Sequence, residues 1–155
     1  AADCAPRTGP PMTPQAPLAA LQTSPWAYPA LEAAHVAGIA VLFGSLLLFE
    51  LRVLGLGRGI DTGALARFAL PVSVASFALA ALTGLTMFAT QPQELLANPA
   101  FRLKMLLLML AGANAGWFHA RGSLVRADAI ARLQAVASAC LWLSVIACGR
   151  AIAYV

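Results

Sequence analysis

The sequence predicts an all-α membrane protein: a bundle of four transmembrane helices preceded by an extended, proline-rich N-terminal tail. Of its 155 residues, 61% are hydrophobic and 10% are charged, a composition typical of integral membrane proteins. Four apolar runs each reach the ~20 residues that cross a hydrocarbon core of about 30 Å. They are residues 29–54, 67–90, 99–120 and 133–154. Two parts are therefore expected, a tail (residues 1–28) and a transmembrane domain (residues 29–155).

The tail differs in composition from the rest of the chain. Its closely spaced prolines prevent a continuous helix and favour extended chain. They are Pro6, Pro10, Pro11, Pro14 and Pro17. The chain begins Ala1-Ala2-Asp3. Removal of a signal peptide after a small residue would explain this start. The alternative is that this start is unrelated to processing. We expect an exported tail that either lies along a partner subunit or is loosely ordered, with Trp26 and Tyr28 in the headgroup layer.

Arginines set the predicted orientation. They gather in the loops after the first and third runs: Arg52, Arg58, Arg67, Arg121, Arg126 and Arg132. The loop between the second and third runs offers mainly Glu94. The positive-inside rule then places both termini on the periplasmic side of a bacterial inner membrane. Arg102, Lys104 and Arg150 are exceptions on the outer side.

Each run has features of a membrane helix. The first repeats small residues at four-residue spacing, including Ala34/Gly38 and Ala40/Gly44, which lets helix backbones approach closely in lipid. In the second, Pro71 is expected about one turn from the start, followed by hydroxyls that bond to their own backbone. In the third, Asn98 suits the N-cap and Pro99 the first helical position. We expect Glu50 and Arg52 to be ordinary interfacial charges.

The cysteines and the charges exclude several functional classes. Cys4, Cys140 and Cys148 form no CxxC, CxxCH or zinc spacing, which argues against c-type haem and structural zinc. An oxidising compartment would permit a Cys4–Cys148 disulfide, although cysteines inside membrane helices usually pack as small apolar residues. Nucleic-acid binding is not supported, because the net charge of +4 comes from loop arginines. Hydrolase triads, P-loops and dinucleotide fingerprints are absent from the sequence.

Two ionisable side chains interrupt apolar runs at membrane depth, His35 and Lys104. Such groups usually face a protein interior, a cavity or a cofactor. At ~1.5 Å rise per residue, His35 lies roughly 9 Å past Pro29 and Lys104 roughly 7.5 Å past Pro99, both from the outer side. We therefore expect them in one leaflet. His119 lies roughly 30 Å past Pro99, so one iron is not readily held by both histidines of a single chain.

An imidazole inside a helical bundle is a common way to hold haem b. We expect His35 to bind the haem iron, with Lys104 or Arg102 serving the propionates or a second axial position. Glu32 lies one turn before His35 and could orient its imidazole. Such a subunit would exchange electrons with a quinone or a larger redox complex, and two chains could share one haem through their His35 residues.

Two other functions remain open, and the sequence leaves undecided whether the chain is an enzyme. A non-catalytic accessory subunit of a respiratory or photosynthetic membrane complex would pack through its small-residue faces and its tail, but it has no need of Lys104 at depth. A copper-handling protein would combine His35 with soft ligands. These are Met87, Met105, Met109, Cys140 and Cys148.

Three segments also carry a family resemblance: residues 26–38 (WAYPALEAAHVAG), residues 51–57 (LRVLGLG) and residues 98–104 (NPAFRLK). With Asn114 and Phe118-His119, they look like an uncharacterised bacterial family of four-helix membrane proteins. More distantly, the first-helix histidine and third-helix lysine are similar to those of CopD-type copper-resistance proteins and HemJ-type protoporphyrinogen oxidases. The HemJ-type resemblance would give His35 and Lys104 roles in haem b binding and activity. The tryptophan-glycine and arginine patterns that usually follow the HemJ-type histidine are absent, so the resemblance implies haem more than that reaction.

Overall fold

The structure, a computed structural model, describes residues 24–126 and 128–154. Regular secondary structure in these two ranges is entirely helical, so the all-α prediction is confirmed there. The helices are α2 (Ala27–Val53), α3 (Thr62–Thr90), α4 (Pro92–Ala97), α5 (Pro99–Ala120), α6 (Ser123–Arg126) and α7 (Ala129–Ala151). Most of the expected tail, including Cys4 and its expected bond to Cys148, lies outside the described residues.

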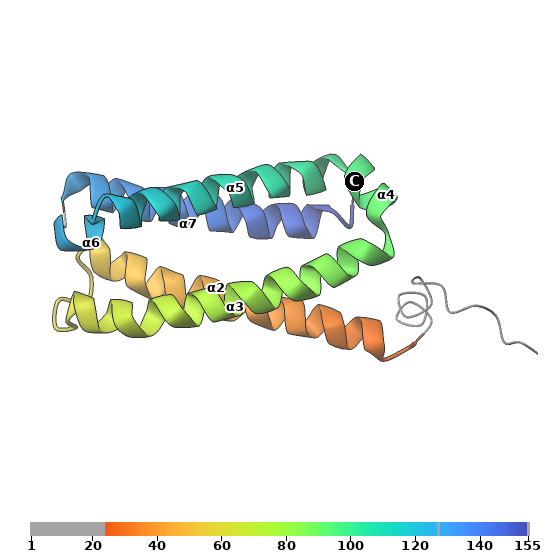
Figure 1. Cartoon of the computed structure of the whole chain (residues 1–155), viewed down its shortest axis with the longest axis horizontal. Coiled ribbons are helices and arrows are strands. Elements are labelled where there is room, and N and C mark those ends of the chain that lie inside the picture. Colours follow the sequence, from red (N-terminus) through yellow and green to blue (C-terminus); the bar gives the residue numbers. More distant parts are fainter. Residues whose placement is uncertain (1–23, 127, 155) are drawn as a thin grey trace, which may run out of the picture.

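The four long helices form two antiparallel pairs, which stack as two layers (Figure 1). One layer is α2 packed along α3, and the other is α5 packed along α7. The layers meet chiefly through α2 and α7, whereas the backbones of α3 and α5 stay apart and meet through side chains such as the stacked Phe88 and Phe101. At one end α6 joins α5 to α7, and at the other α4 leads from α3 into α5.

Three of these helices, α2, α3 and α7, are long and apolar enough to cross a membrane, which supports a multi-pass membrane protein. Large apolar side chains on α3 are exposed, as expected for a surface that faces lipid: Phe68 is 73% and Val74 68% exposed. Helix α5 does not meet the same standard of length and hydropathy. Its apolar run is interrupted by Arg102, Lys104, Asn114 and His119.

Two helices begin earlier than the apolar runs indicated, because aspartates cap them. The Asp61 carboxylate accepts a first-turn backbone N–H at 2.7 Å, and α3 begins at Thr62 rather than at residue 67. Asp128 does the same at 2.9 Å, and α7 begins at Ala129 rather than at residue 133. Pro71 consequently lies inside α3, so the expectation that it sits about one turn from the start is wrong. The apolar runs were cut at Arg67 and Arg132, whereas both helices continue past these arginines to their caps.

The predicted start of α5 is confirmed. The Asn98 side-chain oxygen accepts hydrogen bonds from the backbone N–H groups of Ala100 and Phe101, at 2.9 and 3.2 Å. Pro99 occupies the first turn, where its missing N–H costs no helical hydrogen bond. This cap fixes the point from which Lys104 enters the bundle.

Gly38 is where α2 comes closest to α3. A Cβ atom at this position would lie 3.2 Å from the backbone nitrogen of Ala80 and 3.3 Å from the backbone oxygen of Ser76. Gly44, in the same small-residue pattern, would meet nothing within 4 Å. The pattern therefore marks a close helix contact at Gly38 and not at Gly44.

Gly38→Ala is expected to destabilise the protein by about 1–3 kcal/mol, because the new methyl group must push the α2 and α3 backbones apart. Gly44→Ala is the matched control on the same helix, and its higher helix propensity should leave stability unchanged or raise it by up to about 1 kcal/mol. Thermal unfolding in detergent, followed by circular dichroism, measures both. Equal transition temperatures for the two variants would contradict the close contact.

The α6 end of the bundle is fastened by polar and aromatic contacts. Phe49 of α2 meets Phe118 of α5 edge to face, with ring centroids 5.9 Å apart. The buried Ser123 hydroxyl donates to the Gln134 side-chain oxygen at 2.7 Å. Arg121 and Asp128 form an ion pair at 2.6 Å across the turn between α5 and α7. The Phe49–Phe118 contact ties the two layers together at this end, and the other two contacts fix the turn between α5 and α7.

The Asp128 carboxylate makes the ion pair sensitive to acid. The Arg121 hydrogen bond, helped by the Ala131 N–H, holds the pKa of Asp128 below its ordinary value of 3.8. Because the folded state lowers this pKa, the stabilisation is present above about pH 4 and is lost as the pH falls through the folded-state value. Asp128→Asn, which keeps a good N-cap, should unfold at a lower temperature than wild type at pH 7, and the difference should vanish in acid. A pH-independent difference would contradict the ion pair's role.

Candidate functional site

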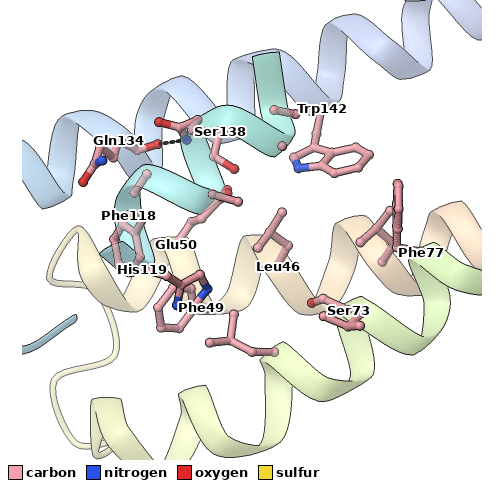
Figure 2. A pocket seen from close by; sticks show the side chains of 18 of the residues that line it. Leu46, Phe49, Glu50, Ser73, Phe77, Phe118, His119, Gln134, Ser138 and Trp142 are labelled. Carbon is pink, nitrogen blue, oxygen red and sulfur yellow. Dashed lines mark hydrogen bonds between the residues drawn. The ribbon is translucent and has the colours of Figure 1, made fainter. Parts of the chain in front are cut away.

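Two cavities lie one after the other between the helix layers. The His35 cavity, about 450 Å³, lies toward α4, and its lining includes His35, Gly84, Phe88, Phe101, Lys104 and Met105. The Glu50 cavity, about 250 Å³, lies toward α6, and its lining includes Glu50, Ser73, Phe118, His119, Gln134 and Ser138 (Figure 2). Phe77 and Trp142 line both cavities, and their rings meet edge to face with centroids 6.2 Å apart.

His35 is held in the bundle by Thr83 of α3. The His35 Nδ1 atom lies 2.9 Å from the Thr83 hydroxyl oxygen. That hydroxyl has its own acceptors, the backbone oxygens of Leu79 at 2.8 Å and Ala80 at 3.1 Å. The arrangement therefore favours a proton on Nδ1, which donates to Thr83, and leaves Nε2 with a free lone pair. Metal-ligating histidines are commonly oriented in this way, by a hydrogen bond from the ring nitrogen that does not bind the metal.

Gly84 makes room for the imidazole. A Cβ atom on Gly84 would lie 3.0 Å from His35 Cε1 and 3.5 Å from Nδ1. The ring therefore rests directly on the backbone of α3. The sequence reasoning correctly expected Thr83 to bond to its own helix backbone, but missed that Thr83 and Gly84 also position His35.

Lys104 lies on the other side of the same cavity. It is half-buried on α5, and its Nζ atom rests against Gly149 of α7, where a Cβ would lie 3.5 Å away. His35 and Lys104 are close enough to interact electrostatically. The structure thus brings together the two residues that the depth argument placed in one leaflet, one from each helix layer.

The other predicted site residues lie outside this cavity. Glu32 and Arg102 are exposed, and neither lines the His35 cavity, although Glu32 is within electrostatic range of His35. His119 lines the Glu50 cavity. The two histidines of the chain therefore face different cavities, as the depth argument requires.

The proposed copper ligands do not gather around His35. Met105 lines the His35 cavity, whereas Met109 is 74% exposed and Cys140 is exposed. Cys148 lies within electrostatic range of Lys104. Among residues 24–126 and 128–154, no three His, Cys, Asp or Glu side chains group as a metal site. Of the soft ligands named for copper, Met105 lines the cavity of His35.

Glu50 is the residue whose role the sequence reasoning misjudged. Expected at the interface, it is instead buried, with 3% of its surface exposed. Ser138 of α7 faces its carboxylate, yet neither carboxylate oxygen has a hydrogen bond of ordinary geometry within the described residues. Its neighbour Arg52 turns the other way and donates to the Ile60 carbonyl at 2.6 Å.

A helical stripe in the sequence could have revealed this burial. His35, Ile39, Leu42, Leu46, Phe49 and Glu50 line the two cavities. Their spacing of three and four residues puts them on one face of α2. Glu50 therefore shares the face of His35, and only its nearness to the loop suggested an interfacial position.

Comparison of the chain with protein-family models, with curated proteins and with solved structures gives no match.

Proposed function

We propose that this chain is a haem b-binding protein of the bacterial inner membrane that serves as an electron-transfer subunit. His35 would bind the iron through Nε2, and Lys104 would hold the haem either as the cation for a propionate or as a further ligand. The haem would supply one-electron oxidation and reduction. Glu32 and Arg102 are proposed to act at the mouth of the site.

The observation that carries the proposal is the joint placement of His35 and Lys104. A neutral imidazole oriented through Nδ1 and a lysine cation line one cavity. Its volume of about 450 Å³ lies within the roughly 300–1,000 Å³ of small-molecule and cofactor sites. The stacked rings of Phe88 and Phe101, 5.6 Å between centroids, provide flat apolar walls. The donor set therefore fits a haem with one histidine ligand, and the HemJ-type resemblance supports the same two residues.

The proposed topology has α5 as a fourth transmembrane helix and both termini in the periplasm. Antiparallel packing of α5 along α7, which is itself apolar enough to span, supports a fourth crossing. Two polar residues of α5, Lys104 and Asn114, line the cavities inside the bundle. This placement lowers the free-energy cost of putting their side chains at membrane depth.

Extraction and quantification of haem from the purified full chain tests the proposal. We expect one haem per chain, or one per two chains if a dimer shares it, and no stoichiometric copper in the same sample. Absence of haem would refute the proposal and leave the accessory-subunit function. Stoichiometric copper without haem would favour the copper-handling function.

A further inference from the structure

The Glu50 cavity holds polar atoms that the described part of the chain does not satisfy. Both carboxylate oxygens of Glu50 and the side-chain nitrogen of Gln134 are buried without a hydrogen bond of ordinary geometry, although the Ser138 hydroxyl faces the carboxylate. Each of the two residues is only 3% exposed. A buried polar group left unpaired is destabilising, and more so when it is charged. The cavity that these atoms line therefore calls for a partner from outside the described residues.

The chemistry of the lining indicates what this partner must offer. No lysine or arginine is among the described residues that line the Glu50 cavity, so a neutralising cation from the chain is not at hand. A carboxylate only accepts hydrogen bonds when ionised, so the partner must carry a donor. The side-chain nitrogen of Gln134 can only donate, so an acceptor suits the same ligand or a water beside it. Hydroxyl and carbonyl groups meet both needs.

The cavity walls favour a flat ring. Phe49, Phe77, Phe118 and Trp142 all contribute to its lining (Figure 2). A cavity of about 150 Å³ lined by apolar side chains is enough to bind benzene. About 250 Å³ therefore has room for a substituted ring.

The route into the cavity leads from the lipid. Val74 and Phe77 of α3 line the cavity and are also 68% and 44% exposed. On α5, Gly112 and Ala115 line it and are exposed as well. The backbones of α3 and α5 stay apart and the lining residues just named are exposed, so the cavity reaches the apolar surface of the bundle between these two helices. A ligand that enters here must be soluble in the bilayer.

We propose that the Glu50 cavity binds the ring of a lipid-soluble quinol, with the Glu50 carboxylate accepting a hydrogen bond from a ring hydroxyl. The lipid tail of the quinol leaves between α3 and α5. Phe77 and Trp142 separate this ring from the His35 cavity, which makes the quinol an immediate neighbour of the proposed haem. The use of bound quinol as an electron donor rests on the proposed function, whereas its binding does not.

The test is binding of a decyl-tailed benzoquinol, and of its quinone form, to the full chain in lipid nanodiscs. At a pH high enough to ionise Glu50, its carboxylate accepts from the quinol hydroxyl and has nothing to donate to a quinone, so wild type should prefer the quinol there. Glu50→Gln keeps the size of the side chain and adds a donor. It should weaken quinol binding by about tenfold or more, the loss of one hydrogen bond to a charged group, and remove the preference.

Glu94→Gln on α4, an exposed carboxylate that lines neither cavity, is the matched control and should bind both probes like wild type. Thermal unfolding shows whether each variant is folded. The inference would be overturned if quinol binding to wild type did not saturate, or if wild type and a folded Glu50→Gln variant bound quinol with equal affinity. Haem is quantified in the same samples. If quinol binding is saturable and depends on Glu50 but no haem is present, only the proposed function is refuted. If haem is present without such quinol binding, only this inference is refuted.

Discussion

His35→Ala is expected to abolish haem binding. The variant removes the imidazole whose Nδ1 is held by Thr83 at 2.9 Å and whose Nε2 would bind the iron. No other histidine lines the His35 cavity among the described residues, so no imidazole can replace it. The haem content of the purified variant, from its absorption spectrum and from extraction, should fall to background.

His119→Ala is the control for this prediction. His119 lines the Glu50 cavity instead, so its removal should leave the haem content at the wild-type level. If the two variants lost haem to the same extent, or if His35→Ala kept it, His35 would not be the ligand.

Gly84→Ala is expected to have the second largest effect on haem, although the residue carries no chemistry. Its methyl group would lie 3.0 Å from His35 Cε1, closer than side-chain carbon atoms normally approach, and Gly84 itself lines the cavity. The imidazole must therefore move away from α3 and from Thr83. Overpacking typically costs about 1–3 kcal/mol, which corresponds to about 5–150-fold weaker haem binding.

Haem titration of the apoprotein measures this effect. Gly116→Ala on α5 is the matched control, because its methyl group would meet nothing within 4 Å and the residue lines neither cavity. Unchanged haem affinity of Gly84→Ala would show that the imidazole does not need its place on the α3 backbone.

Much of the fold follows from composition and from a few local signals. The apolar runs located the four long helices, and Asn98-Pro99 located the start of α5 to the residue. The starts of α3 and α7 were missed, because the apolar runs were cut at Arg67 and Arg132, whereas the helices extend past these arginines to the caps Asp61 and Asp128. The pairing of the helices into two layers depends on close contacts such as Gly38 with Ala80, and spacing within one helix does not identify its partner.

The sequence predicts the positions of site residues that depend only on depth in the membrane, but not the contacts that depend on which helix lies beside them. His35 and Lys104 were expected in one leaflet, and both line one cavity. Thr83 and Gly84 could not be assigned to His35, because their contact joins residues far apart in the sequence. Glu50 was misjudged because its distance from the loop, rather than its helical face, was used to place it.

The structure divides the interior of the bundle into two linked compartments. One compartment pairs His35 with Lys104; in the other, no residue of the described part of the chain makes a hydrogen bond of ordinary geometry to the Glu50 carboxylate or the Gln134 amide nitrogen. Phe77 and Trp142 form the shared wall.

The most direct test of the central claim is the dithionite-reduced minus oxidised absorption spectrum of the purified wild-type chain. The proposed His35 site predicts the α-band and Soret shift of a b-type haem. A featureless difference spectrum, together with no haem on extraction, would contradict it.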